Sequence, residues 1–218
     1  LKSLKKIHSI MFNIDMRTST PDVVIDFTLP VSTLDLLEFG ENNKIPAVIG
    51  TTGFSSEEKR KIANFAEKYG AVFSPNMSPG VNITFKLLEN AASFFTDEYD
   101  VEIIESHHRN KVDAPSGTAL AMAKILSSVK KNLIESEYCF GRKGFTGTRK
   151  KNEIGFSVVR GGDIVGEHSV IFAGIGETIE LTHKSSSRDS YSKGALLAAK
   201  FLCENTPGLY SMNDVLSL

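Results

Sequence analysis

The residues best suited to chemistry lie close together near the middle of the chain. Two adjacent histidines, His107 and His108, follow a short apolar segment, and Arg109 and Lys111 come directly after them. Histidine titrates near neutral pH and can donate or accept a proton, while lysine can supply a proton or a positive charge. Adjacent side chains on a strand point to opposite faces, so both histidines can serve one site only where the chain has left the strand. The spacing therefore predicts a proton-transfer loop, and structural hydrogen bonding of the pair is the alternative.

A small turn that leads into a helix is the second feature of this region. Ser116, Gly117 and Thr118 open the helix predicted over residues 118–129, and Pro115 stiffens the approach. The N-terminus of a helix presents unpaired N–H groups and the positive end of its dipole, which suits a carboxylate or a phosphate. Together with the nearby cations, the turn predicts a small anionic substrate, and a simple serine cap is the alternative.

A metal site is a further interpretation, because His107, His108 and Asp113 carry ligand types. Two consecutive histidines chelate a metal poorly, however, and neither Cys139 nor Cys203 is near them in sequence, so we expect no metal; a metal hydrolase is the corresponding rival function. The two isolated cysteines also predict free thiols and a reducing compartment, the cytoplasm.

Composition excludes several classes of partner. The formal net charge of the 218 residues is −1, which is not the basic footprint of a nucleic-acid-binding protein. No apolar run approaches the roughly 20 residues that span a bilayer, and no signal peptide is expected at the start. The chain therefore predicts a protein that binds neither nucleic acid nor membrane, with enough length for one domain or two modest ones.

Alternating strands and helices are predicted in the first third of the chain. The predicted elements are strands over 7–15, 22–27, 45–49 and 71–73, a helix that Ser32 caps and that ends at Gly40, and a helix that Ser55 and Glu58 cap and that runs to Tyr69. This order is typical of a parallel doubly wound sheet, whose ligands bind outside the carboxyl ends of the strands. The loops there, 28–30, 50–53 and 74–76, are rich in small residues and hydroxyls, which favours a planar cofactor over ordinary turn chemistry.

The second half predicts a different sheet. After a helix over 81–96, strands over 101–106, 155–160, 168–172 and 177–183 alternate polar and apolar residues, which is typical of an antiparallel or mixed sheet with one covered face. We expect the other face to be apolar and to bury against another subunit. The residues expected there are Val158, Val170, Ile171, Ile179 and Leu181. A helix over 191–202 and a short tail complete the chain.

The segment from Glu105 to Ala119, ESHHRNKVDAPSGTA, closely resembles the signature of the 4-hydroxy-tetrahydrodipicolinate reductase family, also called dihydrodipicolinate reductases. Weaker matches lie at 48–53, 75–82, 160–168 and 176–188. The resemblance implies an α/β protein with a truncated Rossmann-like parallel-sheet domain and an α+β substrate-binding and tetramerisation domain with a mixed sheet. The dinucleotide-binding domain is expected over 1–77 and 189–218, and the substrate domain over 78–188.

The resemblance also implies a reaction and its residues. The expected reaction is the NAD(P)H-dependent reduction of a small cyclic dicarboxylate in lysine and diaminopimelate biosynthesis by a homotetramer. His107 matches the family's proton donor or acceptor and Lys111 its proton donor, while His108, Gly117 and Thr118 match positions that bind the substrate carboxylate. NADPH or NADH is expected at Gly50, Thr51, Thr52, Ser74, Pro75, Asn76, Met77 and, near the adenosine ribose, Asp15.

One part of the family pattern is not found at the front of this sequence. The family opens with a strand and a glycine-rich loop for the cofactor pyrophosphate, whereas here residues 7–15 match the family's second strand. We expect upstream sequence to be missing. The alternative is a non-catalytic relative that binds the dicarboxylate without a working cofactor site.

Overall fold

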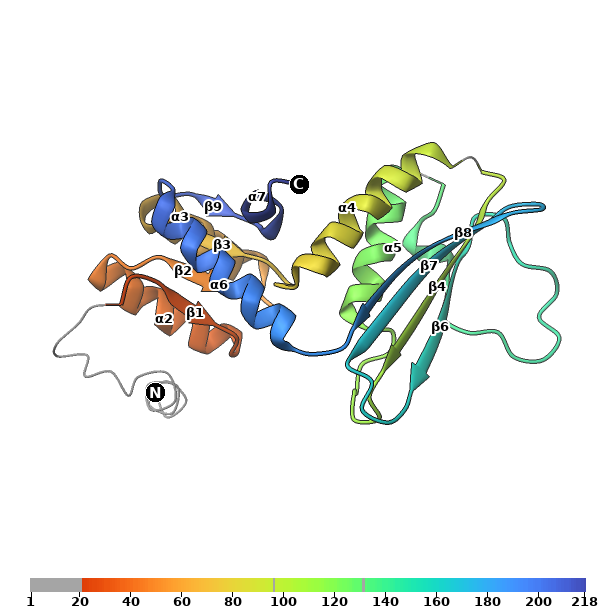
Figure 1. Ribbon diagram of the computed structural model, residues 1–218, viewed down its shortest axis with the longest axis horizontal. Helices are drawn as coiled ribbons and strands as arrows, with labels where there is room; N and C mark the ends of the chain where they lie inside the picture. Colours follow the sequence, from red (N-terminus) through yellow and green to blue (C-terminus); the bar gives the residue numbers. More distant parts are fainter. Residues whose placement is uncertain (1–20, 96, 131) are drawn as a thin grey trace. The chain divides into compact units, whose positions relative to one another are not determined.

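The computed structural model describes residues 21–95, 97–130 and 132–218. It divides into two compact units: unit 1 comprises the chain up to Pro79 together with Asp189–Leu218, and unit 2 comprises Gly80–Arg188. Both are drawn in Figure 1. The strand predicted over 7–15, and Asp15 with it, lies outside the described residues.

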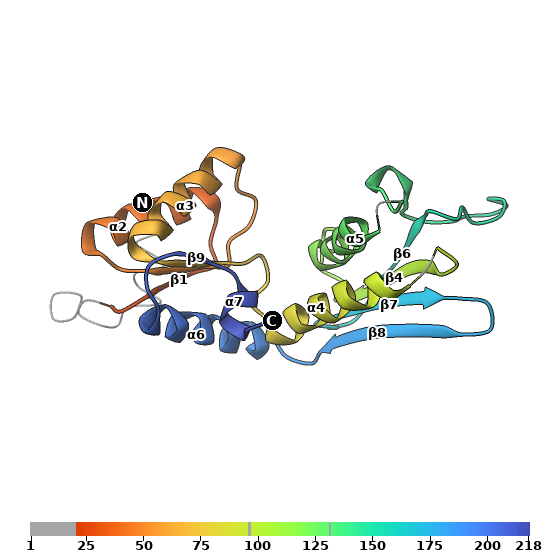
Figure 2. The ribbon, with the colours of Figure 1, turned by 90° about the horizontal axis from the view of Figure 1, so that it is seen from above.

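Unit 1 is built on a parallel four-stranded sheet in the order β1-β2-β3-β9. Its strands are β1 (Val24–Asp26), β2 (Ala47–Ile49), β3 (Ala71–Phe73) and β9 (Leu209–Tyr210). Helices α2 (Pro30–Asn43) and α3 (Ser56–Tyr69) pack on one face, and α6 (Asp189–Glu204) and α7 (Met212–Leu216) pack on the other, as Figure 2 shows. Because both faces are covered, the strands are almost wholly apolar. This confirms the predicted doubly wound parallel sheet.

Two boundaries in unit 1 differ from the prediction. Helix α2 does not begin at Ser32; it begins at Pro30, whose fixed φ suits the first helical turn. It also continues past Gly40 to Asn43, and Gly40 lies inside the helix against the ring of Phe65, where a side chain would not fit. The predicted tail contains β9 and α7, which close the sheet and its second face.

Unit 2 is a five-stranded mixed sheet in the order β5-β6-β4-β7-β8, which confirms the predicted mixed sheet. The strands are β4 (Asp100–His107), β5 (Tyr138–Cys139), β6 (Ile154–Arg160), β7 (Gly166–Ala173) and β8 (Thr178–Ser185), and the helices are α4 (Pro79–Phe94), α5 (Gly117–Val129) and the 3-10 turn η1 (Glu135–Glu137). Leu88 of α4 and Met122 and Leu126 of α5 pack on Ile103 and Phe172 to form the core. Buried and half-buried residues alternate strictly along β4.

The prediction of an apolar, outward-facing side of the second sheet is partly wrong. Val170 is fully buried in the core beneath the helices, and Leu181, its partner across β7 and β8, packs against the same core. Val158 and Ile179 are partly exposed, but they pair with Glu105 and Phe172 on the side of the helices. The prediction failed because apolar residues run through 170–172 without a break, and such a run does not define which residues face inward.

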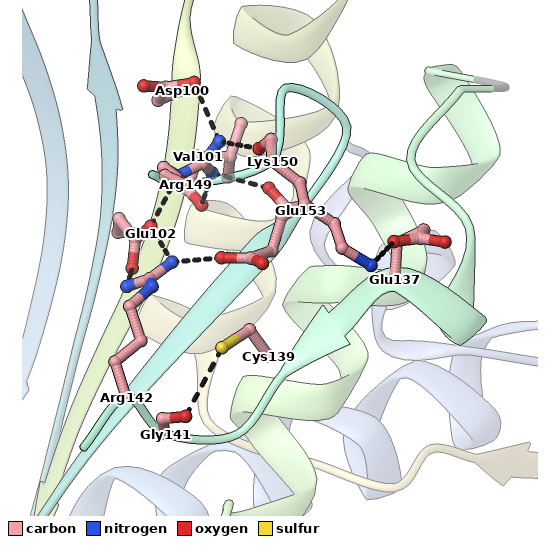
Figure 3. A network of polar contacts seen from close by, with 10 residues as sticks. All are labelled: Asp100, Val101, Glu102, Glu137, Cys139, Gly141, Arg142, Arg149, Lys150 and Glu153. Carbon is pink, nitrogen blue, oxygen red and sulfur yellow. Dashed lines mark hydrogen bonds and ion pairs between the residues drawn. The ribbon is translucent and has the colours of Figure 1, made fainter. Parts of the chain in front are cut away.

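The loop between β5 and β6 is attached to the sheet by two arginines (Figure 3). Arg142 binds both carboxylate oxygens of Glu102, at 2.8 and 3.1 Å, and also contacts Glu153. Arg149 binds Glu102 at 2.9 Å and Asp100 at 2.7 Å. Such bidentate pairs fix geometry as well as charge, so the ends of this loop are held at defined positions on β4.

Candidate active site

The site in unit 2 begins at the end of strand β4. His107 is still part of the strand, and it shares the helix-covered face with Glu105, two residues earlier. His108 is the first residue beyond the strand, and its carbonyl accepts a hydrogen bond from the N–H of Lys111 at 3.1 Å. The chain therefore leaves the strand between the two histidines, which separates the buried His107 from the half-buried His108.

Glu105 is the centre of a buried polar network. Its side chain is 1% exposed and lies 2.5 Å from His107, measured from Oε2 to Nδ1. Arg160 of β6 donates two hydrogen bonds to the carboxylate, at 2.7 and 2.8 Å, and the N–H of Ser116 donates a third at 2.9 Å. These donors compensate for the burial of the charge, as a buried carboxylate requires.

The network shifts the pKa values of both partners. Burial opposes ionisation of Glu105, but the hydrogen bonds from Arg160, His107 and Ser116 outweigh it and hold the pKa of this carboxyl below its usual range. Burial lowers the pKa of His107, the charges of Lys111 and Arg160 lower it further, and Glu105 opposes them. At neutral pH the pair is therefore a carboxylate and a neutral imidazole that can take up or release a proton nearby.

Helix α5 begins beside this network, as predicted. Ser116 caps it, since its hydroxyl oxygen accepts a hydrogen bond from the N–H of Ala119 at 3.2 Å. The same hydroxyl lies 2.9 Å from Nε2 of the buried His168, whose ring packs edge-on against His107. Burial and the neighbouring His107 lower the pKa of His168 to about 4, so His168 is neutral and positions Ser116.

The start of α5 is open to a ligand. A side chain at Gly117 would meet no atom of the described residues within 4 Å, so the space beside the first residue of the helix is open. The N–H groups of Gly117 and Ala119 are bound to Asp113 and to the hydroxyl of Ser116. Thr118 follows in the first turn. Lys111 pairs with Asp113 at 2.7 Å, and this contact lowers the pKa of the Asp113 carboxyl. The structure thus brings the start of a helix, a lysine and a buried histidine into one region of unit 2.

Glu105, Arg160 and His168 had no role in the sequence-based site. The two-residue spacing of Glu105 and His107 on a predicted strand was the available signal, because such residues share a face. Arg160 and His168 come from strands far along the chain, and only the register of β4 with β6 and β7 brings them to the site. Among the described residues, no three histidine, cysteine, aspartate or glutamate side chains are grouped to hold a metal ion.

A second polar cluster lies at the carboxyl edge of the sheet in unit 1. The buried Asp26 accepts hydrogen bonds from the hydroxyls of Thr28, at 2.6 Å, and Thr51, at 2.9 Å, and Thr33 also donates to it. The N–H of Thr28 reaches the hydroxyl of Thr51 at 2.8 Å. Asp26 therefore joins the loop after β1 to the loop after β2.

The loops at this edge leave their backbone open in some places and covered in others. The ring of Phe27 lies so close to Gly50 that any side chain there would clash, whereas Thr52 and Pro75 are exposed. Ser74 donates to the carbonyl of Asn76 at 3.0 Å and shapes the loop after β3. Met77 is fully buried among residues of α6 and α7, and its carbonyl lies against Gly194 of α6.

These features define a class of protein. A parallel sheet covered on both faces, with small-residue loops at its carboxyl edge, is the architecture of nucleotide-binding α/β proteins, and unit 2 adds a buried histidine–carboxylate pair beside a helix start. The described part of the chain contains no helix that is both long and apolar enough to cross a membrane.

Comparison with known proteins gives the family. Residues 4–77 match the sequence profile of the dihydrodipicolinate reductase N-terminus, and residues 80–216 match that of the C-terminus. The chain belongs to the dihydrodipicolinate reductase family, a family of pyridine-nucleotide-dependent reductases, which confirms the resemblance seen in its signature.

Individual relatives agree with this assignment. The 4-hydroxy-tetrahydrodipicolinate reductases of Janthinobacterium sp. (strain Marseille) and Burkholderia vietnamiensis (strain G4 / LMG 22486) are 53% and 52% identical over 197 and 206 residues. These alignments cover 90% and 94% of this chain and 74% and 78% of the relatives. The solved dipicolinate-bound dihydrodipicolinate reductase from Paenisporosarcina sp. TG-14 superposes with a TM-score of 0.72 at 28% identity, covering 90% of this chain and 74% of that one.

Proposed function

We propose that the chain reduces (2S,4S)-4-hydroxy-2,3,4,5-tetrahydrodipicolinate to 2,3,4,5-tetrahydrodipicolinate with NADPH or NADH, a step of lysine and diaminopimelate biosynthesis. The net reaction adds one hydride and one proton to the substrate and releases one water. The observation that carries the proposal is the buried His107–Glu105 pair beside the open start of α5, in a chain about half identical to named reductases.

His107 and Lys111 are the proposed catalytic residues. The reduced ring is left as an enamine-like carbanion that needs a proton, and a general acid supplies it most effectively when its pKa lies near the working pH. Nδ1 of His107 faces Glu105, so Nε2 is the nitrogen left for proton transfer. Lys111 supplies a proton and a positive charge beside it, since its charge acts on His107.

Substrate carboxylates are proposed to bind at His108, Gly117 and Thr118. The solved relative from Paenisporosarcina contains dipicolinate, a planar dicarboxylate, which supports a site for this class of anion. In this chain the anion would lie against the positive end of the α5 dipole and beside the positive charge of Lys111. The proposed substrate domain, residues 78–188, therefore coincides with unit 2 to within two residues.

The nicotinamide cofactor is proposed to bind at the carboxyl edge of unit 1, residues 1–77 and 189–218. The residues proposed to hold it are Gly50, Thr51, Thr52, Ser74, Pro75, Asn76, Met77 and, outside the described residues, Asp15. The support for this edge is that Asp26 fixes the Thr51 loop and that Thr52 and Pro75 are exposed there, whereas the ring of Phe27 fills the space beside Gly50. When bound, the cofactor supplies the hydride.

A direct assay tests the proposed function. The chain is mixed with 4-hydroxy-tetrahydrodipicolinate and either NADPH or NADH, and the loss of reduced nicotinamide absorbance is followed. We expect oxidation that depends on the substrate, and competitive inhibition by dipicolinate, because both anions use the start of α5. Binding of dipicolinate without any cofactor oxidation would instead support the non-catalytic relative. A Val112→Ala variant, altered at an exposed position of the same loop, serves as the matched control.

We also propose that unit 2 assembles into a homotetramer through the sheet face that no described helix covers. Ile104, Ser106, Ser169 and Thr182 lie there, and the last two share a hydrogen bond of 2.7 Å, so burial against a second copy leaves their hydroxyls satisfied. We expect light scattering to report four chains for the wild type and fewer for Ile104→Lys, while Val112→Lys stays tetrameric. A monomeric wild type would contradict this.

A cytoplasmic location is the last part of the proposal. Cys139 and Cys203 are free thiols in the structure, which agrees with a reducing compartment. Cell fractionation with detection of the chain would test it, and recovery from the culture medium would contradict it.

A further inference from the structure

We propose that Glu105 is a positioning residue that fixes the ring of His107 and the substrate-binding turn at Ser116 with one carboxylate. This inference rests on the proposed function, in which His107 transfers the proton. Glu105 touches neither the substrate nor the cofactor in this proposal; it acts through the two groups that do.

The first step of the argument is the direction of the hydrogen bond between the two side chains. An ionised carboxylate can only accept hydrogen bonds, so Nδ1 of His107, 2.5 Å away, must carry the hydrogen that it donates to Glu105. Nε2 is then the nitrogen that exchanges its proton with a ligand. Gly166 leaves room there, since a side chain at that position would begin 3.1 Å from Nε2.

The second step is the state of Glu105. A protonated Glu105 could donate to Nδ1 and reverse the arrangement, but the environment holds it as an anion. The guanidinium of Arg160 binds both of its oxygens, and it is itself oriented by the carbonyls of Asp113, at 2.7 Å, and Val159, at 2.8 Å. The result is an Arg160–Glu105–His107 series in which each member orients the next.

The third step is the other oxygen of Glu105. Oε2 faces His107, whereas Oε1 accepts from the N–H of Ser116 at 2.9 Å. Ser116 in turn caps α5 through Ala119 and contacts His168. The carboxylate therefore fixes the distance between the proton-transferring ring and the start of the helix that is proposed to bind the substrate, the kind of alignment on which rate depends steeply.

The test compares Glu105→Gln with Glu102→Gln. Glu102 is on the same strand and, like Glu105, is bound by arginine. Its partners are Arg142 and Arg149, and it contacts no histidine among the described residues. In Glu105→Gln, the amide oxygen can still accept from Ser116, while the amide nitrogen presents a donor to Nδ1. We expect this to move the hydrogen of the neutral His107 ring from Nδ1 to Nε2.

Three readouts separate positioning from mere structural support. Nitrogen NMR of the His107 ring should show hydrogen on Nδ1 in the wild type and in Glu102→Gln, and on Nε2 in Glu105→Gln. The kcat of Glu105→Gln should fall by about 100-fold or more, while KM changes only about threefold. The substitution impairs the proton-transfer step and leaves substrate binding nearly intact. The pH midpoint of His107 titration should be lower in Glu105→Gln. Glu105 raises the pKa of His107, whereas burial and the charges of Lys111 and Arg160 lower it, so removing the carboxylate leaves only the lowering effects. The neighbouring ring of His168 stays neutral throughout.

Several outcomes would overturn the inference. Hydrogen on Nε2 of His107 in the neutral wild-type ring would do so without any variant, as would a folded Glu105→Gln with wild-type kcat and ring spectrum. An equal loss of kcat in Glu102→Gln would reduce the effect to general loss of charge on β4. If the wild type fails to reduce the substrate, the proposed function fails, whereas the ring spectrum still decides the role of Glu105.

Discussion

Replacing His107 by alanine is expected to lower kcat by about 10²–10⁴-fold while leaving the affinity for dipicolinate close to that of the wild type. The imidazole is the buried group poised for proton transfer, and its removal takes away the proton donor. The carboxylates are proposed to bind at the start of α5, which this substitution does not touch. Steady-state kinetics and calorimetric titration with dipicolinate measure the two quantities separately.

The matched control for this prediction is His183→Ala. His183 is also a partly buried histidine of unit 2, and burial lowers its pKa too, but it lies on β8 opposite His168 and has no hydrogen bond to Glu105 or His107 among the described residues. It should retain kcat. A His107→Ala protein that keeps a kcat within about threefold of the wild type would show that His107 is not the proton donor.

Replacing Arg160 by alanine is expected to lower the free energy of unfolding by about 3 kcal/mol at neutral pH. Arg160 is the only arginine that contacts Glu105 among the described residues, and its removal leaves a charge that is 1% exposed without its main partner. The loss lies at the lower end of the range for broken buried pairs because Glu105 keeps its hydrogen bonds to His107 and Ser116. Denaturant unfolding measures it.

The stability difference should depend on pH in a defined direction. The pKa of Glu105 in the folded protein is below that of the unfolded chain, so the ionised carboxylate contributes stability above the unfolded value of about 4.3 and loses it as the pH falls through the folded value. In Arg160→Ala this contribution is gone. The difference between the two proteins should therefore be full at pH 7 and shrink as the pH falls below about 4.3.

Lys184→Ala is the control, because Lys184 pairs with the exposed Glu167 of the same sheet and should cost at most about 1 kcal/mol. A loss for Arg160→Ala that is equal to the control, or that does not change with pH, would contradict the role of a buried charge.

The sequence predicted the fold where apolar patterns and punctuation agreed. Ser55, Glu58 and Gly70 mark both ends of α3, and the structure confirms the capping box and the stop. The pattern failed where polar and apolar residues do not alternate. Every residue along 170–172 is apolar, so the sequence does not show which of them face the helices, and the pairing with β8 decides it. The strand β9 was missed because two residues give too short a pattern, and it exists only through its pairing with β3.

Candidate residues for one half of the site could be selected from the sequence, whereas those of the other half could not. The candidates of the first half lie within twelve positions, so one short segment of sequence shows them together: His107, Lys111, Gly117 and Thr118. The residues that tune His107 come from β6 and β7, up to 61 positions away from it, as His168 shows. Their contribution depends on the register of two ladders, which no local pattern contains.

The central position of β4 has a consequence for timescales. The strand is hydrogen-bonded to β6 on one side and to β7 on the other over most of its length. Its amide hydrogens can exchange with solvent only when a ladder opens, so β4 belongs to the slowest-exchanging part of unit 2. His107 thus moves with the most rigid strand, whereas Lys111 lies on a loop free of such ladders. We therefore expect faster internal motion on the lysine side of the pair than on the histidine side.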